Sequence, residues 1–239
     1  MRVHIVWQNE KTEPGEYLAW ARRRGFDVTY TKCWLYEGMP LEEEPADMLI
    51  VLGGWQNPGT TKEECDYYDS PSEQALIRQY VESGKIVIGS CLGAQLIGDA
   101  LGGHFEKSPE PEIGPVLVSK TDEGRTDPFL KDLPDEFEAG EWHYDMAGLI
   151  PGRKVLARSE GCPRQIIRYG EFVYGLQCHM EFTHEIIVNF LEKIGDTLDD
   201  RENYRFIQSE EELFAYDYTR MNGLLSRFLD AVADAYLYA

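Results

Sequence analysis

Short apolar runs alternate with segments of helical periodicity along the first half of the chain. The apolar runs span residues 2–7, 27–33, 48–54 and 85–90, and the helical segments span residues 14–25, 70–84 and 92–103. Runs that are apolar almost throughout are typical of strands buried on both faces, and strands that alternate with helices form parallel sheets. The sequence therefore predicts an α/β fold, with a parallel sheet covered on both sides by helices.

The second half of the chain has a different character. Residues 104–170 are rich in Pro, Gly, Asp and Glu, with short β-like pieces, and are followed by a predicted strand at 171–183 and a helix at 184–195. The tail carries a helical pattern with one apolar face, formed by Met221, Leu224, Leu225, Phe228 and Val232. We predict a main domain at 1–195 and a C-terminal helical extension at 196–239. The extension docks on the core or on a second subunit, and docking on the core is the simpler expectation.

The net negative charge of the chain argues against two classes of partner, nucleic acids and anionic membranes. The 239 residues include 43 Asp and Glu against 23 Lys and Arg, a formal net charge of -20. Binding to nucleic acid or to an anionic membrane needs clustered cations, so neither partner is expected. No stretch approaches the roughly 20 apolar residues of a membrane span, and the N-terminus is too short and too polar for a signal peptide. These features predict a cytoplasmic protein.

The five cysteines are expected to be free thiols. Their number is odd, their spacing is irregular and no C-x-x-C pair occurs, so neither a disulfide framework nor a zinc site is indicated. A metal site formed by Cys162, Cys178 and His179 is disfavoured, because neighbours on a strand point to opposite faces. No metal or cofactor is expected. The cysteines are Cys33, Cys65, Cys91, Cys162 and Cys178.

One cysteine lies at a junction between a predicted strand and a predicted helix, in the stretch GSCLGAQ. Cys91 could be a packing residue, a metal ligand, a redox thiol or a nucleophile. Gly89 and Gly93 flank it in the pattern G-x-nucleophile-x-G, in which a sharp turn leaves no room for neighbouring side chains. A helix N-terminus beneath the sulfur favours the thiolate, and the Leu92 N–H can point at an oxyanion. The pattern favours a nucleophile.

A cysteine nucleophile needs a base, and the base needs a group that orients it. Of the five histidines, His179 ends the predicted strand VYGLQCHME, and Glu181 follows two residues later. Residues i and i+2 of a strand face the same side, so Glu181 can reach the His179 ring and stabilise the imidazolium. His4 is expected in the core, whereas His104 and His184 are expected at a turn and at a helix start.

Several ordered blocks resemble a known family. GSCLGAQL, followed much later by GLQCHMEFT, is similar to the G-x-C-x-G-x-Q and H-x-E signatures of class I glutamine amidotransferases. The resemblance covers about residues 45–195 and includes VLGG, EWHYDMAGLIPG and SEGCPRQIIRYG. It is closest in kind to stand-alone, GMP synthase-like members of the family. It implies a flavodoxin-like three-layer α/β/α fold with a mostly parallel central sheet.

The resemblance also implies a site and a reaction. Cys91, His179 and Glu181 would form a catalytic triad that hydrolyses a γ-glutamyl amide through a thioester. The remaining implied residues comprise the oxyanion donors, which are the N–H groups of Gly54 and Leu92, and the substrate-binding residues Gly53, Gln95, Trp142, His143 and Tyr144.

The chain departs from the family pattern at three places. GGWQNPG stands where the family has G-G-P, so Trp55 is expected to shape the pocket. HME replaces the frequent H-P-E, and Ser90 stands where an apolar residue is common. None of these changes removes a member of the triad.

Two functions follow as hypotheses. The first is an enzyme that hydrolyses glutamine or another small γ-glutamyl compound. It would either pass ammonia to a separate synthase subunit or act as a free-standing hydrolase, alone or as a homo-oligomer. The second is a catalytically weak or inactive binding or regulatory protein that keeps the fold, which the unusual GGWQNPG loop suggests.

Overall fold

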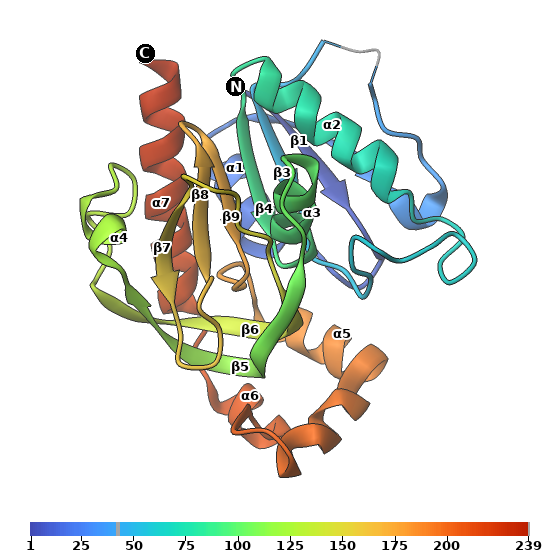
Figure 1. Cartoon of the computed structure of the whole chain (residues 1–239), viewed down its shortest axis with the longest axis vertical. Helices are drawn as coiled ribbons and strands as arrows, with labels where there is room; N and C mark the ends of the chain where they lie inside the picture. Colours follow the sequence, from blue (N-terminus) through green and yellow to red (C-terminus); the bar gives the residue numbers. More distant parts are fainter. Residues whose placement is uncertain (42–43, 239) are drawn as a thin grey trace.

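The computed structural model describes residues 1–41 and 44–238, and within them one large mixed sheet carries helices on both faces (Figure 1). The strands are β1 (Arg2–Trp7), β2 (Asp27–Lys32), β3 (Met48–Val51), β4 (Ile86–Ser90), β5 (Glu106–Lys120), β6 (Glu136–Met146), β7 (Lys154–Arg158), β8 (Ile166–Gly170), β9 (Val173–Leu176) and β10 (Phe206–Ile207). The helices are α1 (Gly15–Arg23), α2 (Ser70–Glu82), α3 (Leu92–Ala100), α4 (Asp122–Thr126), α5 (His184–Ile194), α6 (Glu210–Ala215) and α7 (Thr219–Leu237), with 3-10 turns η1 (Cys33–Leu35) and η2 (Gly195–Glu202).

The sheet combines a parallel half and an antiparallel half. Its order is β10-β5-β7-β8-β9-β4-β3-β1-β2, and β6 pairs with β5 outside this path. Strands β2, β1, β3, β4 and β9 run parallel to one another, whereas β9, β8, β7, β5 and β6 are joined by antiparallel pairings. Four of the five parallel strands, β1 to β4, come from the strand–helix alternation in the first hundred residues, as predicted, and β9 is the fifth.

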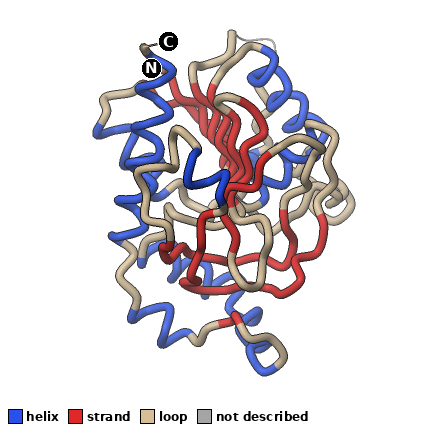
Figure 2. The backbone as a smooth tube through the Cα atoms, turned by 60° about the vertical axis from the view of Figure 1, so that its left-hand side comes forward, coloured by secondary structure: helices blue, strands red, loops and turns tan. Residues whose placement is uncertain are grey.

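Alternate residues of the parallel strands face two separate cores. Ile5 and Ile50 pack with α1 and α7, whereas Val51 and Val87 pack with α2 and α3. Burial on both faces explains why these strands are apolar throughout. Figure 2 shows the strands between helices on either side, which confirms the predicted three-layer α/β/α fold.

The C-terminal helix docks on the core, as the simpler expectation had it. Most of the apolar stripe of α7 is buried in the same cluster as α1 and the central strands, whereas Met221 packs in the cluster that contains α5. At its edge, Trp20 Nε1 donates a hydrogen bond to Asp230 at 2.9 Å, and Arg24 forms an ion pair with Asp230 at 2.6 Å. The division of the chain at residue 195 stays a prediction, since α7 shares its core with the first strands. None of the helices in the described ranges is long and apolar enough to cross a membrane.

The strand predicted at 171–183 is shorter in the structure. β9 ends at Leu176, and His179 forms an isolated antiparallel bridge with Gly140 of β6, with N–O distances of 2.7 and 3.0 Å. The apolar pattern continues beyond Leu176 because Met180 and Phe182 are buried, not because the strand continues. His179 is therefore held by β6 and not by its own strand.

The helix after Cys91 packs directly on the backbone of β3. A Cβ atom on Gly93 would lie 2.0 Å from the carbonyl oxygen of Val51, far inside contact distance. The glycine is required by this close approach and not by its φ angle, because Gly93 is helical.

Replacing Gly93 with Ala should destabilise the protein by about 3 kcal/mol or more, because the clash is with backbone that cannot rotate away. Gly223→Ala is the matched control. Gly223 is also helical, and a Cβ there meets nothing within 4 Å, so the change should stabilise by up to about 1 kcal/mol. Urea unfolding measures both, and equal effects would contradict the steric argument.

Candidate active site

Cys91 occupies a strained turn between β4 and α3. Its backbone has φ 51° and ψ −109°, in the left-handed half of conformational space that side chains rarely adopt, at a cost of about 1–3 kcal/mol. A Cβ atom on Gly89 would lie 2.4 Å from the carbonyl carbon of Gly93, so the turn closes only because both residues lack side chains. The geometry matches the nucleophile turn that the sequence predicts.

His179 is fixed in position and orientation from several sides. Its ring stacks on Phe182, with 4.2 Å between ring centroids and 12° between planes. Nδ1 lies 2.6 Å from Oε1 of Glu181, and Ser90 Oγ donates to the same carboxylate oxygen at 3.2 Å. The predicted contact between His179 and Glu181 is therefore present, and Ser90 holds the carboxylate from the strand that precedes Cys91.

Gly53 explains how the imidazole reaches the sulfur. A Cβ atom on Gly53 would lie 2.8 Å from Cε1 of His179 and 3.3 Å from Cβ of Cys91. The bare backbone at this position therefore leaves the space in which the two side chains meet. Gly53 contributes to the site through this space and is not among the residues that line the cavity.

The surroundings of His179 favour its charged form. Burial lowers its pKa, but the Glu181 carboxylate and the Cys91 side chain raise it more, to about 10. At neutral pH the ring is then an imidazolium beside the Cys91 sulfur.

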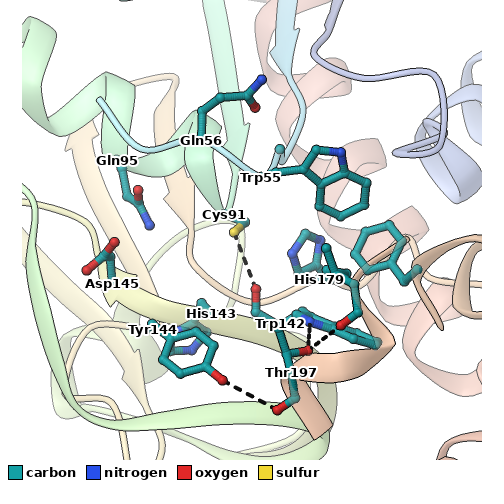
Figure 3. Close-up of a pocket in the computed structure, with 13 residues that line it drawn as sticks. Trp55, Gln56, Cys91, Gln95, Trp142, His143, Tyr144, Asp145, His179 and Thr197 are labelled. Carbon is teal, nitrogen blue, oxygen red and sulfur yellow. Dashed lines mark hydrogen bonds between the residues drawn. The ribbon is translucent and has the colours of Figure 1, made fainter. Parts of the chain in front are cut away.

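A cavity of about 180 Å³ opens in front of Cys91 (Figure 3). Seven of its lining residues were predicted from sequence: Gly54, Cys91, Gln95, Trp142, His143, Tyr144 and His179. Trp55, expected to shape the pocket, also lines it. Glu181 contacts the far side of His179, and Leu92 is the first residue of α3. The structure thus brings together the residues that the separate sequence blocks indicate.

Five further lining residues were not indicated by the sequence. They are Gln56, Asp145, Phe190, Ile194 and Thr197. Asp145 had a signal, because it belongs to the EWHYDM block that resembles the family. The residues of α5 and η2 had none, since only the folding of this segment beside β6 brings them to Cys91. There Trp142 Nε1 donates to Thr197 Oγ1 at 3.1 Å, and Tyr144 OH donates to Asp200 at 2.6 Å.

The unusual GGWQNPG loop is held by hydrogen bonds. The Gln56 amide exchanges two hydrogen bonds with the Asn9 amide, at 3.1 and 3.3 Å, and donates to Tyr67 OH at 3.2 Å. Tyr67 OH in turn donates to Asn9 Oδ1 at 2.5 Å. The loop that follows β3 is therefore fastened to the loop that follows β1, beside Cys91.

A second buried ionic cluster lies behind the pocket. His143 Nε2 is 3.3 Å from a Glu112 oxygen and 3.2 Å from a Glu141 oxygen, and both carboxylates are fully buried. Burial lowers the pKa of His143, but the two carboxylates raise it well above its usual value. Burial raises the pKa of Glu141 to about 7. The imidazolium thus neutralises charge that burial would otherwise make very costly.

Glu112, His143 and Cys162 are also the described residues that could hold a metal ion, with ligand atoms within 4.8 Å of one another. The protein itself engages this carboxylate: Glu112 accepts hydrogen bonds from Ser159 Oγ, the Gly161 N–H and Gln165 Nε2 at 2.9, 3.2 and 2.7 Å. These donors and His143 compensate its charge. The group therefore fits an internal ion cluster better than a vacant metal site.

Removing the cation from this cluster should destabilise the fold. His143→Ala leaves two buried carboxylates facing each other and should cost about 3–5 kcal/mol in urea unfolding. Tyr144→Phe is the neighbouring control on β6; it removes one partly exposed hydroxyl and should cost about 1 kcal/mol. A loss below that of the control would show that the cluster is not held by charge.

Comparison with known proteins agrees with this site. A family model for class-I glutamine amidotransferase matches residues 20–192. The glutamine amidotransferase-like protein YfeJ of Salmonella typhimurium is 45% identical over 236 residues, which cover 99% of each chain. A glutamine-hydrolysing GMP synthase of Aeropyrum pernix is 38% identical over 160 residues, which cover 64% of this chain and 29% of the relative.

Solved structures show the same fold. The crystal structure of SMU.1228c superposes with a TM-score of 0.95 at 43% identity, covering 98% of this chain and all of that one. A glutamine amidotransferase from Thermotoga maritima superposes with a TM-score of 0.83 at 23% identity, covering 97% of each chain, and shares the fold. Since the family model spans most of the chain and the Salmonella relative matches it almost end to end, the chain belongs to the class I glutamine amidotransferase family.

Proposed function

We propose that the protein hydrolyses a γ-glutamyl amide, glutamine or a related compound, through a thioester on Cys91. The observation that carries the proposal is the buried contact of 2.6 Å between His179 Nδ1 and Glu181. Because Nδ1 is occupied, Nε2 remains for Cys91, which is the arrangement that a cysteine nucleophile needs. The family membership of the chain supports the same activity.

The reaction follows from this arrangement. The Cys91 thiolate attacks the γ-carbonyl carbon, and the electron pair of the C=O bond moves to the oxygen. As the C–N bond breaks, the His179 imidazolium gives its Nε2 proton to the departing nitrogen, leaving a thioester and a free amine or ammonia. His179 then takes a proton from water, the hydroxide attacks the thioester carbon, and glutamate leaves as the C–S bond breaks.

The N–H groups of Leu92 and Gly54 are the proposed donors to the oxyanion. Leu92 is the first residue of α3, where a backbone N–H has no acceptor within its own helix. Gly54 lines the cavity, and the hydrogen bonds between Gln56 and Asn9 hold its loop in place. This anchoring favours catalysis over the alternative of an inactive binding protein.

Two residues suit the glutamyl part of the substrate. Gln95 is buried, donates weakly to Gln177 at 3.4 Å and has no partner for Oε1 among the described residues, so this oxygen is available to a ligand. Asp145, which pairs with the exposed Lys107 at 2.8 Å, supplies a carboxylate at the same end of the cavity (Figure 3), suited to the α-ammonium group.

We propose a free-standing hydrolase over a protein that passes ammonia to a synthase. Some relatives are named as glutamine-hydrolysing GMP synthases or as one chain of such an enzyme, and a separate synthase partner is the alternative that these names raise. In this chain the family match ends at residue 192, and Ile194 and Thr197, just beyond it, line one side of the cavity. This side of the cavity is therefore formed by the chain itself and does not need a partner subunit.

Glutamate release tests the activity. The purified full chain, incubated with glutamine and a panel of γ-glutamyl amides, should release glutamate, and Cys91→Ala should reduce kcat by about four orders of magnitude or more. Cys33→Ala, at a buried cysteine outside the cavity, is the control and should keep the activity. An electrophilic glutamine analogue should label Cys91 alone. Turnover that survives Cys91→Ala, or no turnover by folded protein, would contradict the proposal.

The raised pKa of His179 predicts the alkaline limit of the activity. The imidazolium must be protonated to donate to the leaving nitrogen, so kcat/KM should fall as pH rises through about 10, not near 6.5. Glu181→Gln removes the charge that raises this pKa and leaves the burial that lowers it. The alkaline limb should then move down by about one unit or more.

Ser90→Ala is the control for this profile, because it removes a hydrogen bond to Glu181 but keeps the carboxylate charge. Its alkaline limb should stay near pH 10, whatever its effect on the rate. An alkaline limb that Glu181→Gln leaves unmoved would show that another group sets it.

A further inference from the structure

The two ends of the cavity differ in chemistry. Gln95 and Asp145 lie on one side of Cys91, and Trp55 and His179 lie on the other (Figure 3). The first end carries an amide and a carboxylate. The second end is bounded by an aromatic wall, which we define as Trp55, Trp142 and Phe190.

Phe190 contacts both tryptophans of the aromatic wall. Its ring meets Trp55 edge-on with centroids 5.0 Å apart, Trp142 edge-on at 5.2 Å, and the His179 ring at 6.3 Å. Phe190 and Trp142 are buried, whereas Trp55 is half-buried, and half-buried Ile194 also lines this end of the cavity. The wall is thus continuous from His179 to the half-exposed Trp55.

The wall lies where the leaving group of the proposed reaction must go. His179 donates its proton to the departing nitrogen, so that nitrogen lies next to the imidazole. Any substituent on it extends past His179 along the aromatic wall. Ammonia, the leaving group of glutamine, has no substituent that could use this surface.

The indole N–H of Trp142, in the wall, is already engaged. The only N–H of the Trp142 side chain is donated to Thr197 at 3.1 Å, so its ring offers apolar and π surface to a ligand. Asp145 is the only Asp, Glu, Lys or Arg among the described lining residues, and it lies at the other end. A leaving amine with its own carboxylate would find no lysine or arginine among these described residues, and the His179 imidazolium already faces the Glu181 carboxylate.

We propose that the enzyme prefers γ-glutamyl amides whose amine carries an uncharged aromatic ring, held against Trp55, Trp142 and Phe190. This inference rests on the proposed hydrolysis and names its substrate class. The chemistry is the same as for glutamine: the C–N bond breaks and the nitrogen receives the His179 proton. After hydrolysis of the thioester, the products are glutamate and a free amine that carries the aromatic ring. Edge and face contacts between aromatic rings supply the selectivity.

The test compares three substrates with the purified full chain: glutamine, γ-glutamylbenzylamide and γ-glutamylglycine. The benzylamide should have a kcat/KM about tenfold or more above that of glutamine, which corresponds to one or two aromatic contacts. γ-Glutamylglycine, whose leaving group carries a carboxylate, should be hydrolysed no better than glutamine.

Variants of the aromatic wall distinguish contact with the substrate ring from a general effect on the stability of the protein. Trp55→Ala should lower the ratio of benzylamide to glutamine kcat/KM by about tenfold, whereas Trp55→Phe, which keeps an aromatic ring, should retain most of it. Trp34→Ala is the matched control, because Trp34 is also half-buried against another tryptophan, Trp7, but does not line the cavity. It should leave the ratio unchanged.

The outcomes distinguish a failure of the aromatic preference from a failure of the proposed hydrolysis. If glutamine is hydrolysed at least as well as the benzylamide, and Trp55→Ala leaves the ratio unchanged, the aromatic preference is wrong and the hydrolase proposal stands. If γ-glutamylglycine is the best of the three, the leaving group is an amino acid and the aromatic preference is wrong. If folded protein releases glutamate from none of them, both proposals fail.

Discussion

The close packing of α3 on β3 is the constraint on which the rest of the site depends. Gly93 brings the helix backbone to the Val51 carbonyl, directly after the turn in which Cys91 has a positive φ. The same strand leads into Gly53, whose missing side chain leaves room for His179 beside the sulfur. These two glycine positions therefore set where Cys91 and His179 meet, at a cost in backbone strain that the buried core compensates.

Buried charge is organised around two imidazoles, His143 on β6 and His179, whose backbone bridges to Gly140 of β6. His179 lies between Glu181 and Cys91, and His143 lies between Glu112 and Glu141. In both places carboxylates outweigh the effect of burial and hold the ring in its charged form. The difference between them is the contact each ring makes: His179 lies beside Cys91, whereas His143 lies between two carboxylates that join β5 and β6. One arrangement suits proton transfer and the other suits structure.

The cavity combines parts from distant segments of the chain. Cys91, the polar end and the aromatic wall all lie within the family match at residues 20–192, whereas Ile194 and Thr197 lie just beyond it. Trp55 joins the loop after β3 to α5, because that loop is fastened to Asn9 and the indole packs on Phe190. A reaction centre beside a wall built from other elements is a physical way for one fold to accept different leaving groups.

Local chemistry in the sequence determined the parallel half of the sheet, the Cys91 turn and the docking face of α7, because each depends on residues close together in the chain. The sequence also identified His179 and Glu181, but it placed both on a strand that runs to residue 183. In the structure both lie beyond the end of β9, and the bridge to Gly140 and the Phe182 ring orient His179. Only the tertiary structure decided that Asp145, Phe190 and Thr197 meet at Cys91. These contacts join segments far apart in the chain, and no local pattern records which long-range packing will bring them together.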